Sequence, residues 1–204
     1  MPGQDYQIRM KLKVLFLILT LNMSLITSAE SFGLVVHGGA GVLSGLSIER
    51  QQEIENKVKE TLISAYKILE DGGSSMDAVE FAVSEFEDST LFNAGKGSVY
   101  NSDGVQEMDA SIMNGADRSA GAVASVQIIK NPIKLARKVL EETDHVLLVG
   151  RGAEIFAKDI EETIVDRSYF HSEKNLKRLK KAKKRISDNN IICLLYTSDA
   201  ADDN

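Results

Sequence analysis

The spacing of apolar residues predicts two consecutive helices in the first half of the chain. The first begins after a Ser47 N-cap and ends at the glycine pair Gly72 and Gly73. Its core face, at helical intervals, comprises Ile54, Val58, Leu62, Ala65 and Leu69. Ser74 and Asp77 have the spacing of a capping box and predict the start of the second helix. This helix is expected to bury Val79, Ala82, Val83 and Phe86.

Short apolar runs predict four strands. Residues 34–36 form a run that glycines end, which predicts a short buried strand. Residues 105–113 and 120–129 predict two adjacent strands, and the second is small and apolar enough for burial on both faces. Residues 145–150 predict another buried strand. Residues 91–104, rich in turn-forming residues, predict a loop.

Two further helices complete the pattern. Asn131 as N-cap and Pro132 in the first turn predict a helix, whose core face comprises Leu135, Ala136, Val139 and Leu140. Residues 153–158 predict a short helix. Helices and strands therefore occur in pairs and do not strictly alternate, which favours a layered α+β domain over a doubly wound nucleotide-binding fold.

The N-terminal 29 residues have the three-part pattern of a secretory signal. Basic residues precede an apolar run over residues 14–27, and small residues follow at 27–29. We expect a signal peptide over residues 1–29 and a secretory or extracellular protein. The alternatives are a retained signal anchor or a start site wrongly placed upstream of Met10. If the segment is not a signal, the protein is expected to be cytoplasmic.

Charge and composition narrow the function only slightly. The net charge of -6 argues against a general nucleic-acid binder, and the single cysteine, Cys193, cannot form an intrachain disulfide. Residues 173–185 include eight basic side chains and predict a solvated basic helix or linker, with polyanion binding as the alternative. Residues 191–204 combine an apolar half with an acidic half that is typical of a disordered tail.

The residues alone leave the chemistry open. The segment HGGAG, residues 37–41, suits a tight turn, a phosphate cradle or an oxyanion loop, yet the chain has no dinucleotide fingerprint, no complete P-loop and no G-x-S-x-G elbow. His37, His145 and His171 are too far apart in sequence to indicate a transition-metal site. Glu107 and Asp109 share a strand face, where they suit either a polar sheet edge or acid–base work.

Five ordered motifs carry a resemblance to a known family. They are VVHGGAG, DGGSSMDAVE, LFNAGKGSVYNSDGVQEMDASIMNG, SAGAVASVQIIKNPIKLARKVLEET and HVLLVGRGAEIFAK. Together they resemble the plant-type L-asparaginase/isoaspartyl peptidase family of N-terminal-nucleophile hydrolases. The resemblance implies a four-layer αββα sandwich and a precursor that cuts itself before a threonine in a Gly-Thr-Val-Gly motif. The freed threonine would attack asparagine or a β-aspartyl peptide, with its own α-amine as base and no cofactor in the chemistry.

The resemblance also assigns roles to particular positions. Asn93 matches a family asparagine beside the nucleophile, which orients it or helps to bind the oxyanion. Six backbone carbonyls match the ligands of a structural sodium ion: Phe86, Glu87, Ser89, Phe92, Ala94 and Lys96. Thr90 stands where many relatives have proline, so the loop is expected to be looser. His37, Gly38 and Gly39 would form a glycine loop near the active site.

The chain departs from the family pattern where the nucleophile is expected. It contains no Gly-Thr dipeptide, and its only threonine after the basic segment is Thr197. We therefore expect an α-subunit portion over residues 30–172, a linker over 173–190 and no β subunit, as in a truncated or chimeric sequence, with a divergent short form as the alternative. Such a chain should be inactive alone. The family's dimer of αβ units suggests a second function, a non-catalytic fragment that dimerises with intact relatives.

Overall fold

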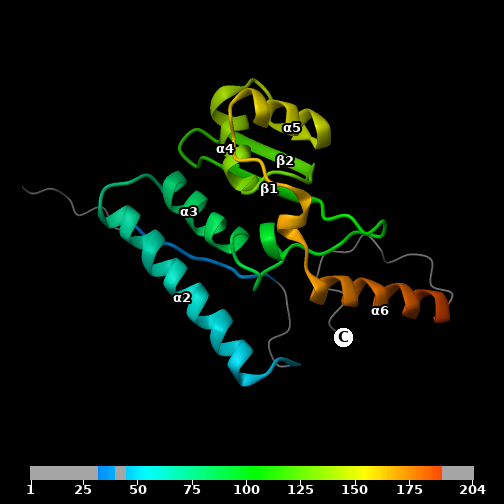
Figure 1. Ribbon diagram of the computed structural model, residues 1–204. Coiled ribbons are helices and arrows are strands. Elements are labelled where there is room, and N and C mark those ends of the chain that lie inside the picture. The colour runs from blue at the N-terminus through cyan, green and yellow to red at the C-terminus, as the bar shows by residue number, and fades with distance from the viewer. Residues whose placement is uncertain (1–31, 40–44, 190–204) are drawn as a thin grey trace, which may run out of the picture. The chain divides into compact units, whose positions relative to one another are not determined.

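The computed structural model describes residues 32–39 and 45–189 (Figure 1). Contacts divide the chain into two units, Met1–Gly33 and Leu34–Asn204, and all the helices and strands below belong to the second. The predicted signal peptide and the tail over residues 191–204 lie outside the described residues. Within the described ranges, no helix has the length and apolar character needed to cross a membrane.

Two helices begin where their N-terminal capping residues predict, and the first ends just before the predicted glycine pair. Helix α2, Ile48–Glu70, has Ser47 as its N-cap, and the Ser47 Oγ accepts a hydrogen bond from the Arg50 N–H. Helix α3, Ser75–Glu87, opens with the predicted capping box between Ser74 and Asp77. The two helices pack against each other (Figure 1). The predicted positions of this helix pair are therefore confirmed, but of the predicted core residues only Ala65, Ala82 and Phe86 are buried, and the others are partly buried.

Three short strands form a sheet in the order β1-β2-β3. Strand β1, Met108–Met113, pairs antiparallel with β2, Ala120–Val126, and β2 pairs parallel with β3, Leu147–Val149. Helix α4, Pro132–Glu142, packs on β1 and β2 and connects β2 to β3. Buried residues from these elements form the core: Met108, Ile112, Val123, Val126, Leu135, Ala136 and Val139.

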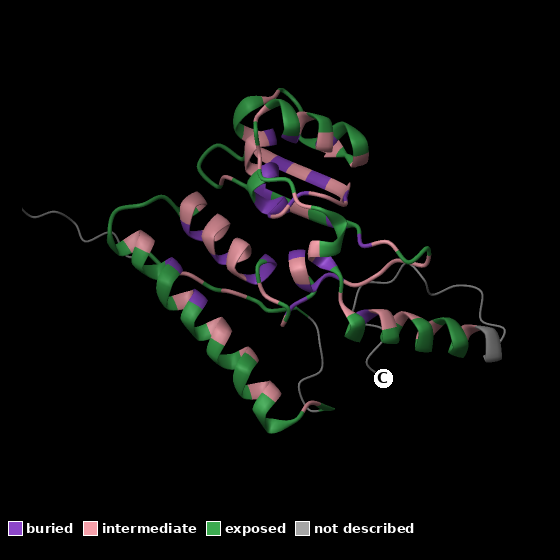
Figure 2. Ribbon diagram, viewed as in Figure 1, coloured by how far each residue is buried: buried purple, intermediate pink, exposed green. Residues whose placement is uncertain are grey.

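Gly121 lets the backbone of α4 approach β2 closely. A Cβ at this position would overlap the Ala136 carbonyl oxygen and lie 2.6 Å from the Leu140 nitrogen. Helix α5, Gly150–Asp159, adds Ala153 and Ala157 to the same core. Figure 2 shows buried positions concentrated on the sheet and α4, with fewer of them on α2. The core therefore lies on one face of the sheet, the face that α4 and α5 cover.

The opposite face of the sheet is open. Residues that pair directly across strands share a face, and on this side Ser111 pairs with Ala122, which pairs with Leu147. Met113, Leu147 and Val149 are 60%, 51% and 53% exposed. No described element covers these apolar side chains.

Several strand predictions need correction. Residues 34–36 do not form the predicted buried strand, since they pair with no described strand and Val35 is 92% exposed. The strand predicted over residues 145–150 is reduced to β3 and is exposed, because it lies at the edge of the sheet beside the open face. Strand β2 buries only one face fully. It ends at Val126, short of the predicted residue 129, and Ile129 forms a separate bridge with Ile164.

The remaining elements are short turns and the basic helix. The 3-10 turn η2, Gly95–Gly97, lies inside the predicted loop, and η3, Arg167–Phe170, precedes α6, Glu173–Asn189. Helix α6 confirms the predicted basic helix, and its described lysine and arginine side chains are exposed (Figure 2). The described residues thus form a mixed α and β structure with one small sheet.

Candidate functional site

Asn93 presents a hydrogen-bond donor in a fixed orientation. It is an exposed residue of the loop after α3, and its Oδ1 accepts a hydrogen bond of 2.9 Å from the Val99 N–H. A backbone N–H can only donate, so this bond determines which end of the amide is oxygen. The Nδ2 group donates to no other described residue. Asn93 can therefore offer an N–H to a developing oxyanion.

Three of the predicted carbonyl ligands converge on two glycines. A Cβ at Gly97 would overlap the Phe92 carbonyl oxygen and lie 2.9 Å from the Ser89 carbonyl oxygen. A Cβ at Gly95, whose φ is +48°, would overlap the Glu87 carbonyl oxygen. The backbone after α3 thus folds tightly around η2, and only glycine leaves room for these oxygens.

Backbone carbonyl oxygens are the groups in this loop that could hold a hard cation. The Phe86 and Ala94 carbonyls each already accept one hydrogen bond, from the Ser89 and Gly97 N–H groups, but a carbonyl oxygen has two lone pairs. In residues 32–39 and 45–189, no three His, Cys, Asp or Glu side chains gather to hold a metal ion. The carbonyl oxygens of this loop are of the ligand type that hard cations prefer.

Asp88 anchors this loop to the start of α4. Its carboxylate accepts hydrogen bonds from Lys130 Nζ at 3.0 Å and Asn131 Nδ2 at 3.2 Å. Burial opposes ionisation, yet the bonds from Lys130 and Asn131 bring the pKa of Asp88 below its ordinary value. The Asn131 side chain therefore binds Asp88 and does not cap α4 as the sequence predicted.

Glu87 caps α4 in place of Asn131. The Glu87 side chain is buried, and its Oε1 accepts a hydrogen bond of 2.9 Å from the Ile133 N–H in the first turn of α4. Its Oε2 is buried without a partner among the described residues. Burial raises the pKa of Glu87 to about 8, although the Ile133 N–H favours the charged form.

The predicted glycine loop lies against the carbonyl loop. His37 Nδ1 accepts a hydrogen bond of 3.2 Å from the Gly39 N–H, which closes a tight turn. A Cβ at Gly38 would lie only 2.9 Å from Cε1 of the buried Phe92 ring, and Phe92 immediately precedes Asn93. The structure therefore brings the segment containing His37, Gly38 and Gly39 next to the loop that carries Asn93.

The remaining carboxylates and histidines considered for catalysis have hydrogen-bond partners away from Asn93 or are exposed. Glu107 accepts hydrogen bonds from the Asn101 and Gln127 side-chain amides, whereas Asp109 accepts one from the Ser125 N–H. These contacts fit the polar sheet surface better than an acid–base pair. His145 is exposed, and His171 contacts the Tyr100 hydroxyl and the Glu173 carboxylate.

A family model described as Asparaginase matches residues 30–201 of the chain. The chain belongs to this asparaginase family. The isoaspartyl peptidase/L-asparaginase of Rattus norvegicus is 48% identical over 151 residues, which cover 71% of this chain and 45% of the rat protein. The human protein of the same name is 47% identical over 149 residues, covering 73% of this chain and 48% of the human protein. Asparaginases and isoaspartyl peptidases are hydrolases, so the chain belongs to a hydrolase family.

An archaeal relative extends the likeness. The plant-type L-asparaginase of Pyrococcus horikoshii is 52% identical over 125 residues, which cover 61% of this chain and 40% of the archaeal protein. The chain thus spans about half the length, or less, of the curated relatives it matches.

Sequence reasoning missed two buried polar residues at this site. The sequence analysis assigned no role to the Glu87 side chain, since only its carbonyl matched the family pattern. Asn175, in a basic segment that predicts solvent exposure, is buried and contacts the loop after Asn93. The interruption of the basic run by asparagine was the only signal for it.

Proposed function

We propose that this chain supplies one half of an active site that hydrolyses the side-chain amide of L-asparagine and β-aspartyl peptide bonds. One observation carries the proposal: Asn93 presents an oriented amide donor in a loop that tightly packed glycines stabilise. The names of the rat and human relatives, isoaspartyl peptidase/L-asparaginase, support this substrate class.

In this proposal the nucleophile is a threonine from a segment that the 204 residues do not include, since they contain no Gly-Thr dipeptide. Self-cleavage would free its α-amine, which takes the proton as the hydroxyl attacks the amide carbonyl. The Asn93 Nδ2–H would donate to the oxyanion of the tetrahedral intermediate. A single donor of this kind contributes a factor of about 10² to 10³ in kcat.

The open face of the sheet supports the four-layer αββα architecture. Met113, Leu147 and Val149 present apolar surface that a second sheet can cover, and stacked sheets bury such faces against each other. The proposal assigns this second sheet to the segment that carries the threonine. Exposed apolar patches of this kind mark interaction surfaces in soluble proteins.

A structural sodium ion is the second part of the proposal. The carbonyl oxygens of Phe86, Glu87, Ser89, Phe92, Ala94 and Lys96 would hold it, and the three that converge on Gly95 and Gly97 support this assignment. The ion would contribute rigidity and take no part in bond breaking. Its test is thermal unfolding in sodium chloride against choline chloride at equal ionic strength. A melting temperature that does not differ between the salts would contradict the site.

The function is tested by fragment complementation. The purified 204-residue chain should release no ammonia from L-asparagine, and addition of a threonine-led β chain from a relative should restore release. Light scattering must show that the two chains assemble. Turnover by the 204-residue chain alone, or none in a verified complex, would contradict the proposal.

The open face also favours a second candidate, a non-catalytic fragment that binds an intact relative as a dimer partner. Mixing the chain with an intact relative would then give a heterocomplex whose activity comes from the relative alone. Leu147→Glu, which places a charge on the open face, should abolish either assembly, with Lys59→Glu on α2 as the control. The two candidates differ in whether the complementing β chain gains activity from this chain.

A further inference from the structure

Asn175 is a buried polar residue for which the proposed chemistry has no use. It lies in the first turn of α6 and is only 8% exposed, although the helix around it is basic and solvated. Its Nδ2 donates hydrogen bonds of 3.0 Å to the carbonyl oxygens of both Gly97 and Ser98. These two bonds hold the first turn of α6 against the loop, because breaking them would leave buried polar groups unpaired at a cost in free energy.

A second buried amide reinforces the same carbonyl. Gln106 Nε2 donates hydrogen bonds of 2.7 Å to the Ser98 carbonyl oxygen and to the Phe170 carbonyl oxygen. The Ser98 carbonyl therefore accepts from the side chains of Asn175 and Gln106. Its position is therefore set by α6 through Asn175 and by Gln106, which lies eight residues after Ser98 and also binds the last residue of η3.

The peptide group that Asn175 holds is the one that orients Asn93. Its carbonyl belongs to Ser98, and its N–H belongs to Val99, which donates to Asn93 Oδ1. A peptide group is planar, so fixing its oxygen also fixes the direction of its N–H. Hydrogen bonds on the two sides of one amide also polarise each other. The contact chain runs from Asn175, through one peptide plane, to Asn93.

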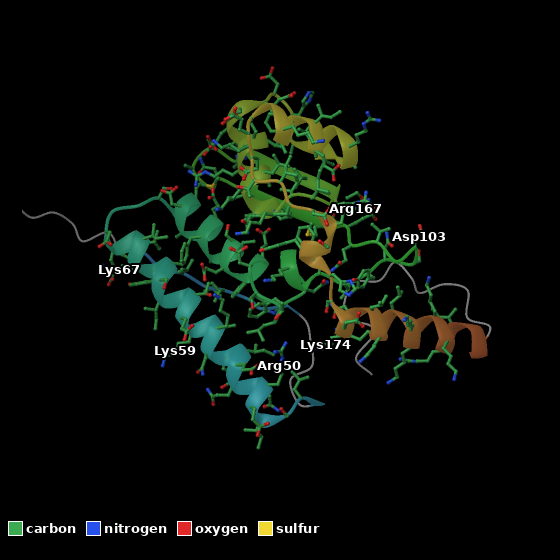
Figure 3. The ribbon with its side chains drawn as sticks, in the orientation of Figure 1. Arg50, Lys59, Lys67, Asp103, Arg167 and Lys174 are labelled. Atoms are coloured by element: carbon green, nitrogen blue, oxygen red, sulfur yellow. The ribbon has the colours of Figure 1, made fainter. Side chains whose placement is uncertain are left out.

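The start of α6 makes further hydrogen bonds of its own, and they reach Tyr100, the residue that follows Val99. Ser172 Oγ accepts a hydrogen bond of 3.2 Å from the Asn175 N–H, and the Tyr100 hydroxyl accepts one of 3.3 Å from the Ser172 N–H. The same hydroxyl lies 3.0 Å from His171 Nδ1. Figure 3 labels Arg167 and Lys174, which mark η3 and the first turn of α6 at this junction. Ser172 thus links the first turn of α6, which carries Asn175, to Tyr100.

We propose that Asn175 is a positioning residue for Asn93, acting through the Ser98–Val99 peptide group. The docking of α6 thereby sets the direction of the Asn93 amide, and release of the first turn of α6 frees it. The inference rests on the proposed function only for the catalytic role of Asn93. The mechanical coupling follows from the contacts alone.

The test is amide hydrogen exchange on the full 204-residue chain. Asn175→Ala should raise the exchange rate of the Val99 amide by about tenfold, the effect of one lost hydrogen bond. Asn175→Asp should do the same or more, since a carboxylate cannot donate to carbonyls. The Val139 amide in the middle of α4 is the reference and should not change. Lys180→Ala, an exposed change on the same helix, is the matched control.

The Asn93 side-chain amide gives a second readout by nuclear magnetic resonance. Its two N–H signals should shift in both Asn175 variants and stay in place in Lys180→Ala. Unchanged Val99 exchange, or an equal rise at Val139, would overturn the positioning role. Because neither readout needs turnover, a failed amidase assay would refute the proposed function without changing this result.

Discussion

Replacing Glu87 with glutamine should remove a pH dependence from the stability of the fold. Glu87 is 3% exposed, its Oε1 accepts the Ile133 N–H, and its Oε2 is buried without a described partner. Burial raises its pKa from 4.5 to about 8, so the folded chain keeps this carboxyl protonated at neutral pH. The Glu87→Gln variant retains an oxygen for Ile133 and remains neutral throughout.

The sign follows from where the proton is bound. Between pH 4.5 and about 8 the unfolded chain loses this proton while the folded chain keeps it. The contribution to the free energy of unfolding is therefore fully present below about pH 4.5 and is lost as the pH rises through about 8. The full loss is on the order of 5 kcal/mol, since the pKa rises from 4.5 to about 8 and one pKa unit corresponds to about 1.4 kcal/mol.

The assay is urea unfolding followed by circular dichroism between about pH 5 and about pH 9. The unfolding free energy of wild type minus that of Glu87→Gln should fall steadily across this range. Measurement above about pH 5 avoids Asp77, whose pKa of about 2 gives the opposite slope in acid. Glu55→Gln, on the exposed part of α2, should keep the wild-type slope. A pH-independent difference for Glu87→Gln would refute the reasoning.

Three further substitutions test the packing that supports the site. Gly97→Ala places a Cβ on the Phe92 carbonyl oxygen and should cost about 1 to 3 kcal/mol in urea unfolding, with loss of any sodium-dependent stabilisation. Gly121→Ala drives a Cβ into the α4 backbone and should cost about as much. Gly152→Ala, on α5 with no atom near its Cβ position, is the control for both and should not destabilise. Arg137→Met removes the partner of Asp77, Glu80 and Glu141 and should cost about 1 to 2 kcal/mol, less at high salt. In that variant, carboxyl titration should show the pKa of Asp77 rising, and an unchanged value would contradict the ion pair.

Local signals predicted the helices well because their caps are local. Ser47, Ser74 and Asp77 satisfy N–H groups within a few residues, so the sequence alone contains both partners of each bond. Asn131 shows where this fails. It has the right residue type for a cap, but Asp88, 43 positions away, competes for its side chain. Glu87 instead accepts the hydrogen bond in the first turn of α4, and it lies 46 positions before its partner Ile133.

Strand burial could not be predicted because it depends on what covers a sheet. The apolar residues of 145–150 indicated a buried strand, yet Leu147 and Val149 are exposed on the open face. Their apolar character fits a surface that another segment covers. The burial of Asn175 could not be predicted for a related reason, since it results from contact with a loop 77 residues earlier. Neighbouring lysines gave no indication of that contact.

The central claim is that Asn93 of this chain completes an amidase site with a threonine from elsewhere. The most direct test is the rate of ammonia release from L-asparagine by the complemented complex carrying Asn93→Asp. The aspartate still accepts the Val99 N–H but cannot donate, so kcat should fall by about 10² to 10³ with assembly unchanged. A complex with Asn93→Asp that matches the wild-type kcat would contradict the account.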